Sequence, residues 1–168
     1  MANAFGIYRG VNLGGWLSQC DYSAERLNGF ITEADFAQIG AWPLDHVRVP
    51  VDYNVLEDDK GGYDAPGWER LDFAIAQSEK HNLKVVIDLH KTAGFSFDQG
   101  EKESGFFDSA AYQERFCRLW EEIARRYGKL NDRVAFELLN EVTSEAYISI
   151  WNRIAAEAIR RIRVFAPD

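Results

Sequence analysis

Short apolar segments alternate four times along this chain with longer segments of helical periodicity. The four apolar segments span residues 5–13, 46–51, 84–89 and 133–139. Val85, Val86 and Ile87 form the continuous apolar run that is typical of a strand buried on both faces. Pro50 cannot donate a backbone hydrogen bond, so we expect strand pairing to stop beside it. The pattern predicts four strands, each followed by a helix.

Polar residues that can cap a helix stand before the helical segments. Thr32 and Asp35 fit a capping box with Asp in place of Glu. Asp64 and Ser109 are suitable N-caps for two further helices, the second of them long. A fourth helix is predicted over residues 145–165 from its apolar positions.

Four strand–helix units with right-handed crossovers produce a parallel sheet with helices on one face only. The other face needs a cover, which in a (β/α)8 barrel is the rest of the barrel. We therefore predict an α/β fold, the (βα)4 half of a TIM barrel, as a single half-barrel unit over residues 1–168. On this prediction the carboxyl-terminal half of the barrel is missing.

Composition and charge exclude several kinds of partner. The chain has 19 Lys and Arg against 27 Asp and Glu, and its net charge of -8 repels phosphate backbones and anionic lipids. We expect neither a nucleic acid nor a membrane partner, and no segment reaches the ~20 apolar residues that span a bilayer. Cys20 and Cys117 lack metal-ligand spacing and are predicted to be free thiols. No signal-peptide pattern is present, so the compartment is undetermined, although a secreted parent enzyme is expected.

Polar side chains stand at three of the predicted strand ends. Arg48 lies on the second strand, His90 follows the third, and Asn140 and Glu141 follow the fourth. Because the carboxyl ends of barrel strands meet at one face, we expect these side chains to converge. An amide beside a carboxylate at this position indicates catalysis by Glu141.

Four motifs, in order along the chain, resemble those of a known family. They are GVNLGGWL at 10–17, DHVRVP at 45–50, VIDLH at 86–90 and FELLNE at 136–141. Each motif is weak alone, whereas four in register at the strands of one fold are a strong signal. The chain resembles the family 5 glycoside hydrolases, especially bacterial cellulases (endo-β-1,4-glucanases). The family commonly has Pro after the Glu of the last motif, and this chain has Val142.

The resemblance implies a retaining β-glycosidase that acts on β-glucan oligosaccharides or polysaccharides, and no cofactor is expected. It implies that Glu141 is the general acid/base and that the nucleophile is a Glu on strand seven, beyond this chain. Asn140 would donate a hydrogen bond to the sugar 2-hydroxyl. Arg48 would hold the nucleophile ionised and in place, and His90 would bind sugar hydroxyls or order that carboxylate.

Other interpretations compete with these roles. Arg48 also fits an ion pair with Glu137, whose strand position faces the interior, and both roles are compatible. Asp88 and His90 lie two apart on one strand face as a metal pair would, but no third ligand is near, so we expect no metal. Trp16 follows the first strand on the catalytic face, where it either stacks on a sugar, as we expect, or plugs the barrel mouth.

Two further aromatic features have alternative interpretations. Trp42 precedes the second strand and is predicted to pack at the bottom of the barrel. The loop over residues 91–108 is punctuated by Gly94, Gly100 and Gly105, and we expect it to form a wall of the substrate cleft. The alternative is that its phenylalanines pack on one another as a miniature core; they are Phe95, Phe97, Phe106 and Phe107.

Two hypotheses about function remain. In the first, the chain is the amino-terminal half of an endo-β-1,4-glucanase, inactive alone and active when another chain supplies the complementary half-barrel. In the second, it is a non-catalytic half-barrel scaffold, natural or engineered, that closes eight strands as a homodimer. Both predict a partner for the open face of the sheet.

Overall fold

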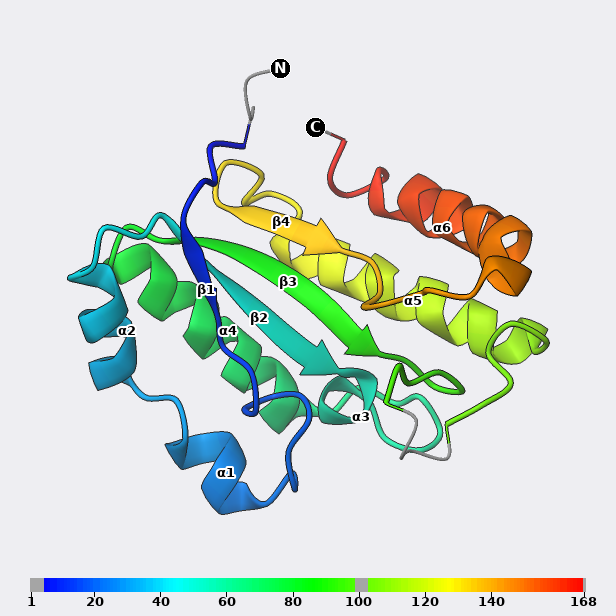
Figure 1. Cartoon of the computed structure of the whole chain (residues 1–168), viewed down its shortest axis with the longest axis horizontal. Coiled ribbons are helices and arrows are strands. Elements are labelled where there is room, and N and C mark those ends of the chain that lie inside the picture. Colours follow the sequence, from blue (N-terminus) through cyan, green and yellow to red (C-terminus); the bar gives the residue numbers. More distant parts are fainter. Residues whose placement is uncertain (1–4, 99–102, 168) are drawn as a thin grey trace.

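The computed structural model describes residues 5–98 and 103–167; Gly100 of the aromatic loop lies outside these ranges. The described chain forms a parallel sheet of four strands in the order β1-β2-β3-β4 (Figure 1). The strands are β1 (Gly10–Asn12), β2 (His46–Asp52), β3 (Lys84–Lys91) and β4 (Val134–Glu137).

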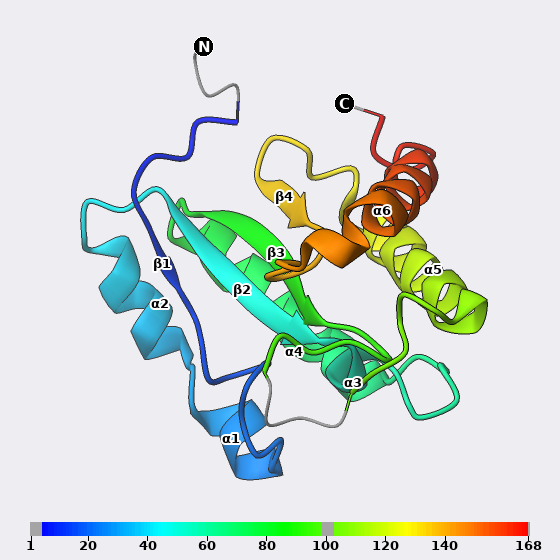
Figure 2. The same ribbon diagram turned by 45° about the vertical axis from the view of Figure 1, so that its right-hand side comes forward.

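Helical segments follow each strand along the chain. They are α1 (Ala24–Gly29), α2 (Glu33–Gly40), α3 (Tyr53–Leu56), α4 (Ala65–Lys80), α5 (Ala110–Tyr127), the 3-10 turn η1 (Glu145–Tyr147) and α6 (Ile148–Ile162). Helices α4 and α5 lie behind the strands, α2 lies against α4 at the β1 side of the sheet, and α6 lies beside α5, past β4 (Figures 1 and 2). The opposite face of the sheet is open, as the half-barrel prediction requires.

The first strand is much shorter than the predicted segment 5–13. The backbone N–H groups of Tyr8 and Arg9 donate to the carboxylate of Asp45 at 3.0–3.1 Å rather than to a neighbouring strand. Since these donors are bound by a side chain, ladder pairing begins only at Gly10, opposite His46.

The prediction that pairing stops at Pro50 is wrong. Strand β2 pairs with β3 through Pro50 and on to Asp52. The carbonyl of Arg48 accepts a hydrogen bond from Leu13 N, so Pro50, two residues later, faces the same edge of β2. There β1 has already ended at Asn12, and the missing N–H of proline breaks no ladder bond.

The helix starts follow the predicted caps. The carboxylate of Asp35 accepts from both the backbone N–H and the hydroxyl of Thr32 at 2.8 Å. Asp64 and Ser109 accept from the backbone N–H three residues on, at the starts of α4 and α5. A Cβ at Gly67 would lie 1.6 Å from Val55 O, so only glycine allows α4 to approach α3 this closely. The predicted fourth helix is divided into η1 and α6.

The core lies between the sheet and the helices, and Trp68 and Trp120 are among its largest fully buried side chains. The prediction that Trp42 packs at the bottom is wrong, because 49% of its surface is exposed. Its backbone N–H donates to Ile39 O in a turn between α2 and β2, which places the ring on the surface. Cys20 and Cys117 are free thiols, as predicted.

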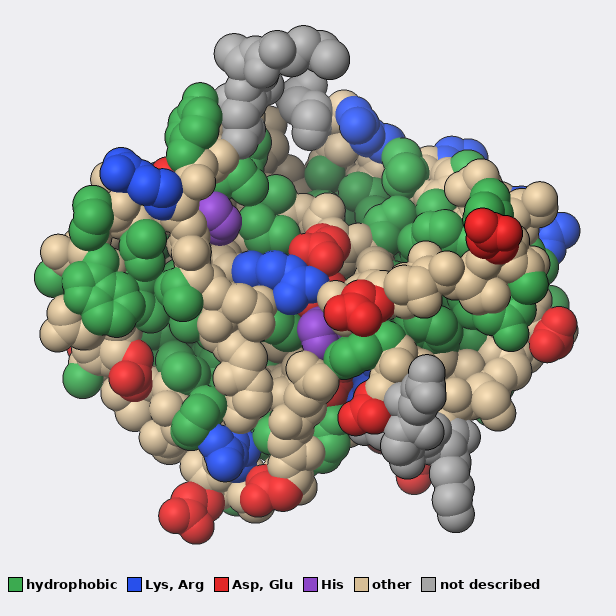
Figure 3. All heavy atoms as spheres, viewed as in Figure 1, with side chains coloured by type: hydrophobic (Ala, Val, Ile, Leu, Met, Phe, Trp, Pro, Cys, Tyr) green, Lys and Arg blue, Asp and Glu red, His purple; other side chains and the backbone are tan. Residues whose placement is uncertain are grey.

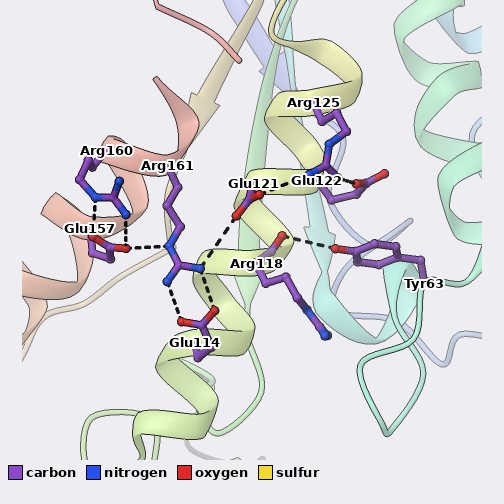
Figure 4. A network of polar contacts seen from close by, with 9 residues as sticks. All are labelled: Tyr63, Glu114, Arg118, Glu121, Glu122, Arg125, Glu157, Arg160 and Arg161. Carbon is purple, nitrogen blue, oxygen red and sulfur yellow. Dashed lines mark hydrogen bonds and ion pairs between the residues drawn. The ribbon is translucent and has the colours of Figure 1, made fainter. Parts of the chain in front are cut away.

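A network of charged side chains fastens α6 to α5 (Figure 4). The guanidinium of Arg161 donates twice to Glu114, at 2.8 and 2.6 Å, and once to Glu157 at 2.7 Å. Arg160 donates twice more to Glu157 at 2.8 Å. The network therefore joins α6, the helix that follows the loop carrying Glu141, to α5.

Candidate active site

Arg48 stands at the centre of a polar cluster on the open face of the sheet. Its Nε and Nη2 donate to the two carboxylate oxygens of Glu137 at 2.7 and 2.8 Å. Its Nη1 donates to Asn12 Oδ1 at 2.9 Å, and Nη2 also lies 3.1 Å from Asn140 Oδ1 and 2.8 Å from Asp88 Oδ2. The predicted ion pair between Arg48 and Glu137 is confirmed. This hydrogen bond to Glu137 raises the pKa of Arg48.

Figure 3 shows where this cluster lies on the surface. Basic, acidic and histidine side chains gather at the middle of the open face, with hydrophobic side chains on both sides. The members come from all four strands: Asn12 ends β1, Arg48 lies near the middle of β2, Asp88 and His90 lie in the second half of β3, and Glu137 ends β4. The cluster thus extends to the edge of the sheet where barrel enzymes hold their active sites. Of the four side chains expected to converge, Arg48, His90 and Asn140 do so, while Glu141 forms no hydrogen bond or ion pair with them and lies exposed just beyond β4.

Asp88 connects Arg48 to His90. Its side chain is fully buried, and its Oδ2 lies 2.5 Å from His90 Nδ1 as well as 2.8 Å from Arg48. Burial raises the pKa of Asp88, while the hydrogen bond from His90 and the charge of Arg48 act in the opposite direction. The contact fixes the plane of the His90 ring, which is only 6% exposed.

Asn140 and Glu141 lie just beyond β4 and differ sharply in environment. Asn140 is 8% exposed; its Oδ1 accepts from Arg48, while its Nδ2 has no hydrogen-bond partner among the described residues. Glu141 is exposed and adopts a left-handed backbone with φ of 50°. A non-glycine residue rarely adopts this conformation, and such residues cluster at functional sites. The negative charge of Glu141 also contributes to the raised pKa of Arg48.

Trp16 does not take part in this site, contrary to the prediction of sugar stacking. The ring is 1% exposed, its Nε1 donates to Leu27 O at 2.9 Å, and it packs edge-on against Phe73 of α4. Glycine at position 15, with φ of 71°, turns the chain after β1 toward the helices. Trp16 is thus a core residue between the sheet and α4.

The aromatic loop mostly forms the miniature core that was the alternative interpretation. Phe106 and Phe107 are buried, both contact Phe95, and Phe107 stacks on Tyr147 at 4.0 Å between ring centroids. Phe97 differs, because its ring lies edge-on to His90 with centroids 4.8 Å apart. One aromatic ring of the loop therefore borders the polar cluster.

The sequence interpretation missed Gln19 and Asp52. Gln19 Oε1 lies 3.2 Å from His90 Nε2, and Asp52, buried at the end of β2, accepts from the backbone N–H of Gln19. The carboxylate directly after an apolar strand was a signal for Asp52. No sequence signal pointed to Gln19, because an exposed glutamine in a loop is an ordinary feature.

The described part of the chain has neither a metal-binding group nor a membrane-spanning helix. Residues 5–98 and 103–167 contain no group of three His, Cys, Asp or Glu side chains placed to hold a metal ion. Within the same ranges, no helix has the length and apolar character needed to cross a membrane.

The fold and the cluster define half of an α/β barrel with a polar site at the carboxyl ends of its strands. Residues 8–168 match the family described as cellulase (glycosyl hydrolase family 5). The chain therefore belongs to glycoside hydrolase family 5.

Individual relatives agree with this assignment. The chain is 57% identical to cellodextrinase A of Ruminococcus flavefaciens over 168 residues, which are 100% of this chain and 50% of the relative. It is 40% identical to endoglucanase C of Acetivibrio thermocellus over 157 residues, 92% of this chain and 45% of that protein. The chain thus spans about half the length of these curated relatives.

Solved structures give the same picture. Endoglucanase Cel5A of Thermotoga maritima superimposes with a TM-score of 0.74 at 26% identity, covering 94% of this chain and 48% of that protein. A crystal structure of a glycoside hydrolase superimposes with a TM-score of 0.84 at 20% identity, covering 96% of this chain and 51% of that protein. The described sheet and helices therefore correspond to half of a family 5 TIM barrel.

Proposed function

We propose that this chain supplies the acid/base half of a retaining β-glycosidase that cleaves β-1,4-linked glucans. The observation that carries the proposal is the exposed carboxylate of Glu141, beside an Asn140 that Arg48 holds in place. The family assignment and the names of the relatives, cellodextrinase and endoglucanase, support β-glucan oligosaccharides or polysaccharides as substrates.

In the proposed reaction Glu141 protonates the departing glycosidic oxygen and later deprotonates the attacking water. Glu141 is suited to this because its carboxylate forms no hydrogen bond or ion pair with any described residue and is open to solvent. The Nδ2 donor of Asn140 is buried and has no partner among the described residues, which supports a hydrogen bond to the sugar 2-hydroxyl that strengthens in the transition state.

A retaining mechanism needs a second carboxylate ~5 Å from the first. Among the residues that the structure describes, the other carboxylates of the cluster are occupied: Glu137 by Arg48, Asp88 by Arg48 and His90, and Asp52 by Tyr22. We therefore place the nucleophile outside this chain, in the complementary half of the barrel. Among the described residues Arg48 Nη1 donates to Asn12 alone, so it keeps one N–H with which to hold that nucleophile.

The experiment combines this chain with the half of Ruminococcus flavefaciens cellodextrinase A that it does not cover, as two coexpressed chains. We call this complex the hybrid barrel. Cellotetraose hydrolysis is followed by proton NMR of the anomeric signals. We expect the isolated chain to stay at background, because acid assistance alone contributes only ~10²–10⁴-fold. The hybrid barrel should release the β-anomer first.

A matched pair of variants assigns the activity. Glu141→Gln removes the proposed acid, and Glu145→Gln removes an exposed carboxylate four residues further along the chain. Only the first should inactivate the hybrid barrel on cellotetraose. Hydrolysis by the highly purified isolated chain, abolished by Glu141→Ala, would contradict the proposal that the nucleophile lies elsewhere.

A further inference from the structure

The segment that follows β1 is held in an unfavourable backbone conformation. Gln19 and Tyr22 have φ values of 51° and 54°, in the left-handed region that favours glycine. Such a residue is strained and persists only where its surroundings enforce the conformation. Contacts with a single buried side chain hold both residues in this conformation.

The enforcing group is Asp52, at the last position of β2. Its side chain is 1% exposed, and its Oδ2 accepts from the backbone N–H of Gln19 at 3.2 Å and from the hydroxyl of Tyr22 at 2.5 Å. Lys91, at the end of β3, lies 4.0 Å from the same oxygen. A buried carboxylate with these partners fixes the loop rigidly to the ends of two strands.

The loop in turn places the side chain of Gln19 beside the proposed site. Its Oε1 lies 3.2 Å from His90 Nε2, while His90 Nδ1 is bound to Asp88. Both ring nitrogens of His90 are therefore occupied and the ring is buried, so His90 cannot bind a sugar hydroxyl directly in this arrangement. Gln19 is exposed, and its Nε2 has no partner among the described residues.

We propose that Gln19 is a substrate-contacting residue: His90 Nε2 donates to its Oε1, and its amide NH2 donates a hydrogen bond to a hydroxyl of the bound glucan. His90 and Asp52 then act as positioning residues, which orient the amide through its carbonyl and its backbone. The partly exposed ring of Phe97, edge-on to His90, borders the same place with an apolar surface. An amide donor beside an aromatic ring suits a sugar, which has hydroxyls at its rim and C–H groups on its faces. This inference rests on the proposed glycosidase function.

The test measures cellotetraose binding by calorimetry in the hybrid barrel that carries Glu141→Gln to prevent turnover. Gln19→Ala should weaken binding about fivefold, the value expected for one neutral hydrogen bond of ~1 kcal/mol. Gln19→Glu retains an acceptor for His90 but has no side-chain N–H to donate. Its affinity for cellotetraose should therefore fall at least as far as that of Gln19→Ala. Gln38→Ala, at an exposed position of α2, is the matched control and should bind as the parent does.

A second measurement reads the positioning contact without any substrate. In the isolated chain, nitrogen-15 NMR of the imidazole side chains should show a shift of His90 Nε2 in Gln19→Ala and none in Gln38→Ala. An unchanged His90 signal in Gln19→Ala would overturn the contact that the inference requires.

The outcomes separate this inference from the proposed function. If the wild-type hybrid barrel neither cleaves nor binds cellotetraose, the proposed function fails and the sugar contact fails with it. If the hybrid barrel is active but Gln19→Glu binds cellotetraose as tightly as Gln38→Ala, only the role of Gln19 is wrong.

Discussion

Replacing Arg48 by Met should destabilise the fold through Asp88. Asp88 has no exposed side-chain surface and would keep only His90 as a partner, while Glu137 would lose both of its hydrogen bonds. Removing one member of a buried ion pair costs ~3–5 kcal/mol. Because the side chains of Arg48 and Glu137 are 24% and 39% exposed, solvent screening reduces this to about 2–4 kcal/mol.

The loss should depend on pH in a defined direction. Burial raises the folded pKa of Asp88 above its ordinary 3.8, and the charge of Arg48 opposes that rise. Without Arg48 the folded pKa rises further, so the ionised carboxylate becomes more costly in the fold. The loss of folding free energy that the substitution causes through Asp88 is absent below the unfolded pKa of Asp88. This loss grows as pH rises through the folded pKa of Asp88. Arg48→Met should therefore be more harmful at pH 7.5 than at pH 4.

Urea and thermal unfolding, followed by circular dichroism at both pH values, measure this effect. For a chain of this size, 2–4 kcal/mol corresponds to a decrease of about 4–16 °C in Tm. Arg70→Met is the control, since Arg70 makes an exposed hydrogen bond to Asn28. A Tm for Arg48→Met equal to that of Arg70→Met, or a deficit that does not grow with pH, would refute the reasoning.

Three further predictions follow from other parts of the structure. The pKa of Glu157 is lowered to about 2 by Arg160 and Arg161, so its contribution to stability is fully present above pH 4.5 and is lost as pH falls through 2; the Tm difference between Glu157→Gln and wild type should be smaller at pH 2 than at pH 7. Gly67→Ala should cost at least ~2 kcal/mol by overpacking, while Gly29→Ala, in α1 with open space around it, should not lower stability in the same melts. In sedimentation the isolated chain should associate through its free β-strand edges, and a monomer that persists at all concentrations would contradict this.

Much of the fold was predictable because each local signal agreed with the next. Apolar runs, caps such as Asp35 and Asp64, and the regular alternation all indicate strand–helix units, and parallel topology then brings Arg48, His90 and Asn140 to one edge. The limits of the first strand were not predictable, since they depend on a carboxylate that is distant in sequence, Asp45, binding backbone donors.

The parts of the site that escaped prediction depend on the direction in which loops turn. The sequence places Trp16 just after a strand, but the turn at Gly15 sends the ring into the core instead of toward substrate. Gln19 reaches His90 only because Asp52 holds its backbone in a left-handed conformation, and no local pattern encodes that contact.

The account depends most directly on Glu141 as the proton donor. The decisive measurement compares Glu141→Gln with wild type in the hybrid barrel on two substrates, cellotetraose and 2,4-dinitrophenyl β-cellobioside. An activated aryl group departs with little proton assistance, so the variant should lose ~10²–10⁴-fold on cellotetraose and far less in the glycosylation of the aryl substrate. Equal losses on both substrates would contradict the assignment and give Glu141 another role.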